Sequence, residues 1–143
     1  MNVNFFSSSV LWLLLIALPE MVFSQSTDFT IQDVKFESQG ITLAGSILTP
    51  KKTVAAVVIV HGSDPVEREM DFAKRLAKEG IAVLTYDKRG VGESGGVYVG
   101  PSVGTNNIDT TNLNLLSQDA SAAVNTFRNY LKDKKRGIRK DTS

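Results

Sequence analysis

One serine of this chain lies in a glycine-rich segment whose pattern could make it a catalytic nucleophile. Ser94 stands at the centre of Gly92–Gly96, which fits the G-x-S-x-G pattern of a nucleophile elbow. That pattern exposes its serine when it forms a sharp turn directly between a buried strand and a helix. Here the preceding apolar run ends at Tyr86, and Val97–Pro101 does not have a helical pattern. A nucleophilic serine also needs a nearby base, and the one histidine, His61, precedes it. Ser94 is therefore a weak alternative nucleophile.

The same glycine-rich segment fits a pattern of dinucleotide-binding loops. Gly90–Gly95 has the form G-x-G-x-x-G, and in a dinucleotide site this loop opens a helix whose N-terminus faces the pyrophosphate. Neither that helix nor the strand that should follow it is evident in the sequence. We therefore predict no cofactor, and keep a nucleotide-binding domain as one alternative. The chain has no cysteine and one histidine, so no metal site is predicted.

Two segments near residue 40 predict an antiparallel hairpin. Thr30–Phe36 and Ile41–Leu48 alternate apolar and polar residues, the second more regularly, and Gln39-Gly40 between them is a typical turn. The next run, Val54–Val60, is instead continuously apolar and rich in β-branched residues. This pattern is typical of a strand in a parallel sheet that helices cover on both faces.

A helix with marked ends is predicted after this strand. Asp64 is expected to cap its first turn, Pro65 suits the first helical position, and Gly80 is expected to end it. Its apolar stripe consists of Val66, Met70, Ala73 and Ala77. Ile81–Tyr86 then has the composition of a second buried strand, which completes a βαβ unit. The predicted fold class is α/β, with a sheet that is antiparallel at its start and parallel afterwards.

The remaining residues predict one long loop and one long helix. Lys88–Asn107 contains six glycines and a proline and is expected to form a surface loop. A helix is predicted from about Asn112 to Lys132. Its apolar face is expected to consist of Leu113, Leu116, Ala120, Val124, Phe127 and Leu131. The basic residues at 132–140 are typical of a solvated helix terminus with cations near the negative end of its dipole.

Residues 1–24 have the pattern of a signal peptide. Val10–Leu18 is an unbroken apolar run too short to span a bilayer, and residues 22–24 offer a cleavage site before Gln25. The segment has no Lys or Arg and contains Glu20, which keeps an uncleaved anchor as the alternative. We expect a secreted or periplasmic protein with one domain at 25–143 and no stable membrane span after cleavage. With 16 Lys and Arg against 15 Asp and Glu, no nucleic-acid partner is predicted.

Two motifs at the ends of the predicted parallel strands resemble those of a known superfamily. They are the segment from His61 to Pro65, His-Gly-Ser-Asp-Pro, and the segment from Asp87 to Ser94, Asp-Lys-Arg-Gly-Val-Gly-Glu-Ser. Together with the order of elements, they resemble secreted esterases and peptidases of the α/β-hydrolase superfamily, of the dienelactone-hydrolase or serine-aminopeptidase type. The resemblance extends from Phe29 to about Lys132. It implies the N-terminal half of an α/β-hydrolase fold and a small-molecule ester or peptide substrate for the complete enzyme.

This resemblance implies roles for individual residues of the first motif. The main-chain N–H of Ser63 would stabilise the developing oxyanion, Gly62 would permit close approach of the backbone, and His61 would shape the loop. The local sequence alone is equally explained by a turn that ends a strand and by a helix cap at Asp64.

In the second motif, the resemblance implies structural roles. Asp87 and Arg89 would form a buttressing pair by a charge-assisted contact, and Gly90 and Gly92 would shape the loop. A plain exposed ion pair, which contributes little, is the alternative.

The chemistry that the resemblance implies needs residues beyond those just named. In the resembled fold, the next strand lies beside Val54–Val60 and carries the nucleophilic serine, and an acid and a histidine follow. These do not occur by Ser143, so we expect an N-terminal fragment of an exported ester- or amide-hydrolysing enzyme that is inactive alone. Its strand at Val54–Val60 would then be an exposed edge, which favours aggregation. The alternative is a non-catalytic exported protein that binds a ligand through the glycine-rich loop.

Overall fold

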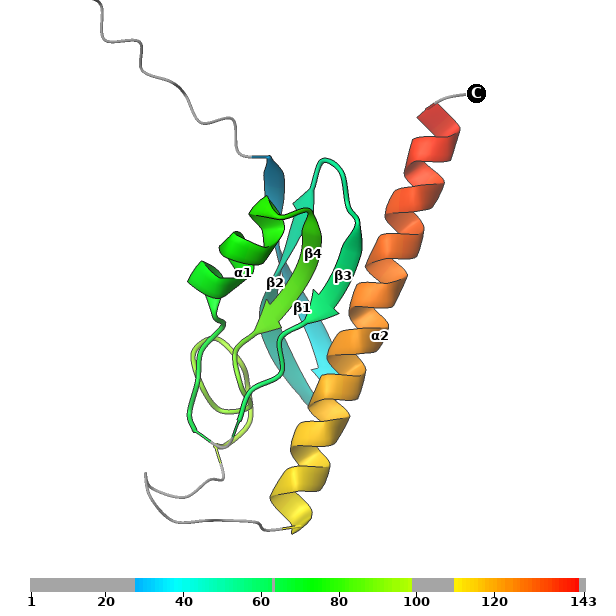
Figure 1. The fold of residues 1–143 in the computed structure, drawn as a ribbon. Coiled ribbons are helices and arrows are strands. Elements are labelled where there is room, and N and C mark those ends of the chain that lie inside the picture. Colours follow the sequence, from blue (N-terminus) through cyan, green and yellow to red (C-terminus); the bar gives the residue numbers. More distant parts are fainter. Residues whose placement is uncertain (1–27, 63, 99–109, 142–143) are drawn as a thin grey trace, which may run out of the picture.

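A four-stranded mixed sheet lies between two helices. The computed structural model describes residues 28–62, 64–98 and 110–141. The elements are β1 (Phe29–Ser38), β2 (Ile41–Pro50), β3 (Ala55–Val58), α1 (Met70–Lys78), β4 (Ile81–Tyr86) and α2 (Thr110–Asp141). The strand order is β1-β2-β4-β3, and α1 and α2 lie on opposite faces of the sheet (Figure 1). The predicted α/β class with a mixed sheet is confirmed.

The hairpin forms because its turn residues adopt the backbone conformation that a tight turn requires. Gln39 and Gly40 have φ values of 48° and 73°, which match the type I′ turn that suits two twisted antiparallel strands. All ten residues of β1 pair with β2, from Phe29 opposite Pro50 to Ser38 opposite Ile41. β2 pairs antiparallel with β4, and β3 pairs parallel with β4. The predicted βαβ unit is thus also present.

The side chains of β4 point alternately to the two faces of the sheet and so belong to two separate apolar cores. Ala82, Leu84 and Tyr86 face α2, whereas Val83 faces α1. On the α2 side, β4 packs with Phe36, Leu43, Ile47, Ala123 and Phe127, and on the α1 side with Phe29, Leu48, Ala73 and Ala77. Because side chains of a strand alternate between its faces, a continuously apolar strand is stable only where both faces are covered. Because β4 lies between β2 and β3, the loop after Tyr86 begins inside the sheet edge and not at its side.

Helix α1 begins later than the sequence predicted. It starts at Met70 with Glu69 as N-cap residue, so Asp64 does not cap it and Pro65 does not open it. The cause is a pair of contacts from β4 and the loop after it: Thr85 Oγ1 accepts a hydrogen bond from the Glu69 N–H, and the Lys88 N–H donates to the Val66 carbonyl. These contacts hold the segment before Met70 out of the helix.

The predicted C-terminal end of α1 is confirmed. The N–H of Gly80 donates to the Ala77 carbonyl, and the φ of Gly80 is 81°.

Helix α2 is longer than predicted and turned about its axis. Among its described side chains, Asp119, Ala123 and Phe127 are buried, and they follow one another at intervals of four. Phe127 was predicted on the apolar face, whereas Leu113 and Val124, also predicted there, are exposed. A polar residue, Asp119, therefore lies on the packed face, and its partners, described below, explain the rotation.

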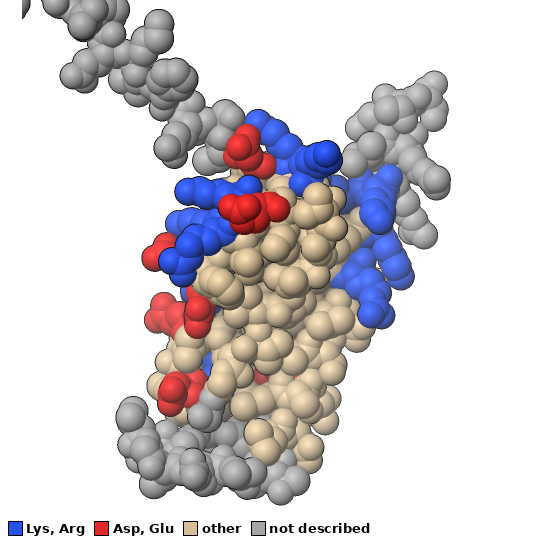
Figure 2. Space-filling view, viewed as in Figure 1, with Lys and Arg blue, Asp and Glu red and all other residues tan. Residues whose placement is uncertain are grey.

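Strand β3 is a short and exposed edge. It contains four residues and ends the sheet, so it is covered less than the pattern of a doubly buried strand predicted. Val54, Val57 and Val60 are 69%, 37% and 53% exposed. Figure 2 shows an uncharged area around β3 between α1 and α2, with Lys and Arg gathered around its upper half. The expectation of an exposed apolar edge at this strand is confirmed.

We predict that this edge causes self-association. Edge strands that carry no charge offer unpaired N–H and C=O groups to another strand, and a lysine at the edge opposes such pairing. Sedimentation velocity over a range of concentrations should show the chain shifting to larger species as its concentration rises. The Val57→Lys variant should shift less.

The matched control is Val97→Lys, which adds the same charge at an exposed valine outside the sheet. If both variants associate like the wild-type chain, the β3 edge is not the contact.

Candidate active-site loops

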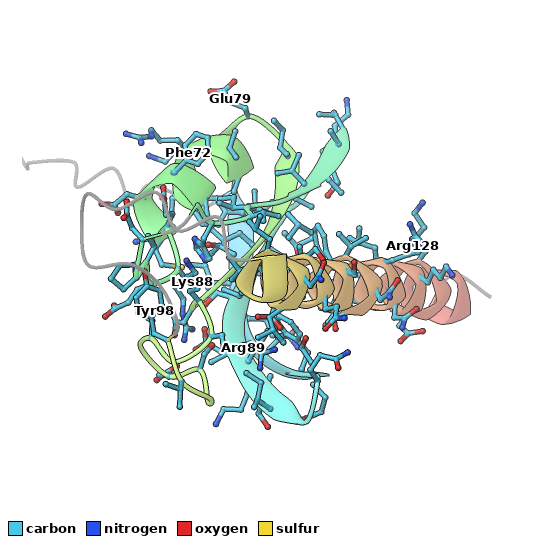
Figure 3. All side chains as sticks on the ribbon, turned by 90° about the horizontal axis from the view of Figure 1, so that it is seen from below. Phe72, Glu79, Lys88, Arg89, Tyr98 and Arg128 are labelled. Atoms are coloured by element: carbon cyan, nitrogen blue, oxygen red, sulfur yellow. The ribbon has the colours of Figure 1, made fainter. Side chains whose placement is uncertain are left out.

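The two motifs meet at the carboxyl ends of β3 and β4. Parallel strands end at the same edge of a sheet, so the loop after β3, which contains His61 and Gly62, lies beside the loop that starts at Asp87. Figure 3 looks onto this end of the molecule and shows Lys88 and Tyr98 within the loops, with Arg89 directed toward the side of α2. Ser63 lies outside the described residues, so its predicted position is not tested.

Asp87 forms a buried ion pair with an arginine that the sequence analysis did not single out. Arg68 Nη2 lies 2.7 Å from Asp87 Oδ2, and Arg68 Nε donates to Asp87 Oδ1 at 3.0 Å. The N–H groups of Arg68 and Glu93 also donate to this carboxylate. Burial alone would raise the pKa of Asp87, but the hydrogen bonds from Arg68 outweigh it and lower the pKa. Asp87 therefore fixes the loop before α1 and the glycine-rich loop in one position.

Arg89 pairs with α2 rather than with Asp87. Its Nη2 lies 2.6 Å from Asp119 Oδ1, and its Nε donates to Asp119 Oδ2 at 3.1 Å. Ser38 Oγ also donates to Asp119, whose side chain is 1% exposed. The predicted Asp87–Arg89 pair is thus replaced by two separate pairs. Asp119 was missed because it interrupts an apolar face and carries no motif, and its pairing explains the rotation of α2.

Ser94 is used as a structural residue. It is buried, and its hydroxyl donates to the Asp87 carbonyl at 2.6 Å and accepts from the Ala44 N–H at 2.9 Å. The first part of the predicted surface loop is therefore packed against β2, and its residues 99–107 lie outside the described residues. No helix follows the glycines within the described part, up to Tyr98, so the geometry of a dinucleotide loop is not present there.

The two glycines expected to shape the loop lie where a side chain would not fit. Gly90 and Gly92 have φ values of 70° and 55°. A Cβ atom on Gly92 would lie 2.7 Å from Asp87 Oδ2, and one on Gly90 would lie 2.0 Å from the Tyr98 nitrogen. Glycine permits both the left-handed backbone and the close approach. These residues let the loop wrap tightly around Asp87.

His61 is anchored to the end of β4. Its Nε2 hydrogen-bonds to the carbonyl oxygen of Tyr86, and the two rings meet edge to face with centroids 5.0 Å apart. Gly62 follows in open surroundings, where an added Cβ would meet nothing within 4 Å. This arrangement is consistent with a loop-shaping histidine and leaves space beside Gly62.

Lys88 is the functional candidate that sequence reasoning missed. It is 2% exposed, and its ammonium group donates to the carbonyl oxygens of Gly62 at 2.8 Å and Asp64 at 3.0 Å. Burial lowers the pKa of Lys88, and the negative charge of Asp64 opposes that shift. A lysine directly after a strand gives no signal of burial in the sequence. In the described ranges, no three His, Cys, Asp or Glu side chains form a group that could hold a metal ion.

The family of the chain follows from a comparison with known sequences. Residues 51–138 match the model of the family described as serine aminopeptidase, S33. The chain belongs to this family of α/β-hydrolases. The predicted resemblance is thereby confirmed, and the matched residues include both motifs and most of α2. No curated protein matches the sequence significantly.

Solved structures of α/β-hydrolases share this part of the fold. The chain is similar to the α/β-hydrolase GrgF from Penicillium sp. sh18, with 27% identity and a TM-score of 0.52, over 69% of this chain and 32% of GrgF. The hypothetical protein PA2218 from Pseudomonas aeruginosa shares the fold at 24% identity and a TM-score of 0.51, over 73% of this chain and 32% of that protein. The chain thus spans about a third of the length of these structures.

Arg68 forms ion pairs with three acids, Asp33, Asp87 and Glu93, and we predict that Asp87 and Glu93 differ strongly in their contribution to stability. Asp87→Asn should lower the free energy of unfolding by about 3 kcal/mol, because it leaves the mostly buried Arg68 without its buried partner. Glu93→Gln should lower it by less than about 1 kcal/mol, because Glu93 is mostly exposed. Urea denaturation measures both values, and equal losses would contradict the assignment.

The pH dependence of these variants provides a second check. Because the pKa of Asp87 is lowered in the folded state, its contribution is present above the ordinary aspartate pKa of about 4. It is lost as the pH falls through the lower folded-state value. The stability difference between the wild-type chain and Asp87→Asn should therefore narrow in acid.

Proposed function

We propose that this chain forms the N-terminal part of an exported α/β-hydrolase that cleaves carboxylic ester or amide bonds by serine acyl transfer. The observation that carries the proposal is the position of the loop after β3. This loop is held at the carboxyl edge of the sheet by Lys88, with open space at Gly62, and it lies next to the exposed edge of β3. A further strand paired parallel with β3 would deliver its first loop residue to this place.

The proposed reaction uses catalytic groups from this chain and from the part of the fold that would follow it. A serine after the added strand attacks the carbonyl carbon of the substrate, and a histidine accepts the serine proton. The backbone N–H of Ser63 donates to the oxyanion that forms, and Gly62 allows the substrate to approach the backbone. Collapse of the tetrahedral intermediate transfers that proton to the leaving group, and water then hydrolyses the acyl-serine. Asp87, Arg89 and the glycine loop hold the scaffold.

The described residues support the view that this chain is inert by itself. The Ser94 hydroxyl is buried in two backbone hydrogen bonds, and His61 is bound to the Tyr86 carbonyl. Neither group is placed to act on the other. A further internal hydrogen bond weighs against ligand binding through the glycine-rich loop, because the Gly95 N–H of this loop already donates to the Thr42 carbonyl.

Export is a separate part of the proposal. The support for it is the apolar run Val10–Leu18 and the small residues that precede Gln25. None of the helices in the described segments is long and apolar enough to cross a membrane. Mass spectrometry of the exported chain can identify its first residue. A chain that begins at Gln25 would support a cleaved signal peptide, and one that retains Met1 would refute it.

The experiment that tests the proposed activity is to read the coding DNA beyond the codon for Ser143 in all three frames. The expected result is a strand, a G-x-S-x-G turn, an acid and a histidine, in this order. The longer product should react with a fluorophosphonate probe at the serine of that turn. If nothing of this kind follows, the acyl-transfer proposal is overturned.

We predict that the 143-residue chain does not react with the fluorophosphonate probe and does not hydrolyse p-nitrophenyl acetate above the buffer rate. The reason is that its one candidate serine is buried and bonded to backbone groups. Labelling followed by mass spectrometry measures this, with Ser94→Ala as the matched control. Labelling that disappears in Ser94→Ala would make Ser94 the nucleophile and contradict the assignment of its structural role.

A further inference from the structure

A groove runs along the exposed edge of β3, between this strand and helix α2. It consists of two adjoining hollows of about 430 and 360 Å³, which share Ala56 and Leu131. The first hollow lies at the start of β3, next to Val54, and the second extends just past its end, next to Val60. The groove therefore follows the strand along its whole length.

The backbone of β3 offers hydrogen-bonding groups along this groove. The Ile59 N–H donates to the Leu84 carbonyl of β4, and the backbone groups of successive residues in a strand point to opposite sides. The N–H and C=O groups of Ala56 and Val58 therefore point to the edge, which has no neighbouring strand among the described residues. Such groups bind an extended peptide by adding it to the sheet as a further strand.

Apolar side chains from both elements line the groove toward the end of β3. Val58 and Val60 come from the strand and the residues after it, and Val124 and Phe127 come from α2. Val60 and Val124 are exposed, so they can bury apolar side chains of an occupant. Since side chains of a strand alternate between its faces, every second residue of an added strand would contact this lining.

Cationic side chains line the groove mainly at the start of β3. Lys51, Lys134 and Lys135 surround the first hollow, and Arg128 adjoins the second (Figure 2). Lys51 lies 3.8 Å from Asp28, whereas no ion pair joins Arg128, Lys134 or Lys135 to an acid of the described segments. Acidic groups are also absent from the described lining of both hollows. Carboxylates of an occupant would complement this charge.

We infer that the chain binds an extended peptide in this groove: the peptide pairs with the β3 edge, places alternate apolar side chains against α2, and carries acidic residues at the end beside Lys134 and Lys135. A second copy of the chain matches the groove less well, because its own β3 consists of two alanines and two valines and brings no acid. The inference does not rest on the proposed function, and the added strand of a longer product would compete with the peptide for the same edge.

The direct test is fluorescence anisotropy of a labelled peptide with the 143-residue chain. The probes are Asp-Asp-Glu-Val-Thr-Val-Thr-Val and its reversed sequence, which cover both strand directions. One of the two should bind with saturation, and added salt should weaken the binding. The same peptide with Lys in place of the three acids should bind about tenfold more weakly or less. If neither acidic peptide binds more tightly than its lysine counterpart, the inference is overturned.

Methylation of the peptide backbone shows whether the peptide binds as a strand. Methyl groups on alternate nitrogens remove the N–H donors on one side of the peptide, and a second peptide carries them on the other side. Only the peptide methylated on the side that faces β3 should lose binding, because it can no longer donate to the strand. Equal affinities for both would assign the groove to an amphipathic anion that needs no backbone pairing, such as a fatty acid, and would overturn the inference.

Charge variants of the chain locate the acidic end of the peptide. Lys134→Glu with Lys135→Glu should weaken binding about tenfold, because both substitutions place like charges beside the carboxylates. The matched control is Lys132→Glu with Lys35→Glu, since both lysines are exposed and neither lines the groove. Equal weakening by the two double variants would mean that only net charge matters, which contradicts the assigned site.

A variant of β3 tests the edge itself. Ala56→Pro removes an N–H that points away from β4, and proline is tolerated at such a position of an edge strand. The variant should fold and bind the peptide more weakly, and if it does not fold, the methylated peptides decide with the wild-type chain. Saturating peptide should also reduce self-association through β3 in sedimentation velocity. If the associated chain binds no peptide, a second copy is the occupant and the inference fails.

Discussion

Three consecutive charged residues after β4 are buried or mostly buried, and each has a partner from a different part of the chain. Asp87 pairs with Arg68 from the segment before α1, Lys88 binds the carbonyls of Gly62 and Asp64, and Arg89 pairs with Asp119 on α2. A buried charge without a partner costs several kcal/mol, so these contacts form together or the loop does not pack. Among the described residues, no buried side-chain nitrogen or oxygen is without a hydrogen-bond partner. The polar cluster therefore determines how the loops and both helices meet the sheet.

This cluster explains features that apolar packing alone leaves open. Apolar side chains alone define the rotation of α2 less sharply, since cores of similar volume lose uniqueness before they lose stability. Asp119 selects one of them because it must reach Arg89 and Ser38. In the same way, Arg68 must reach Asp87, which keeps residues 64–69 outside α1. The polar contacts thus supply the specificity of the fold, while the two apolar cores supply most of the driving force.

The parts of the fold that were predictable from the sequence are those that local residues decide. Gln39 and Gly40 specify a turn by their own backbone preferences, and the apolar run Ile81–Tyr86 specifies a central strand by its composition. The start of α1 was predicted wrongly, and the buried face of α2 was predicted correctly at Phe127 but not at Leu113 and Val124. The reason is that Thr85 and Arg89, which lie far away in the sequence, decide these features.

The residues of the candidate site were also predictable only in part. The motif positions of His61 and Asp87 are recognisable in the sequence, since both follow apolar strands that end at one edge. The partners are not recognisable: nothing near Arg68 or Lys88 indicates burial, and a charged residue is exposed in most settings. The resemblance implied an Asp87–Arg89 pair, whereas the structure contains two pairs with other residues. A buried partner of a motif residue becomes visible only when the topology is known.

The edge of β3 is exposed, whereas the loop beside it is held in place by hydrogen bonds. Helices α1 and α2 cover both faces of the sheet, yet the edge of β3 has no neighbour among the described residues. An added parallel strand would lie about 4.8 Å from β3 and end at the same edge. Its last residue would therefore arrive beside Gly62, at the loop that Lys88 holds. The loop is held without that added strand, because its anchors are the Tyr86 carbonyl at the end of β4 and Lys88 in the loop after it. The apolar edge of β3 stays open to pairing with any other strand.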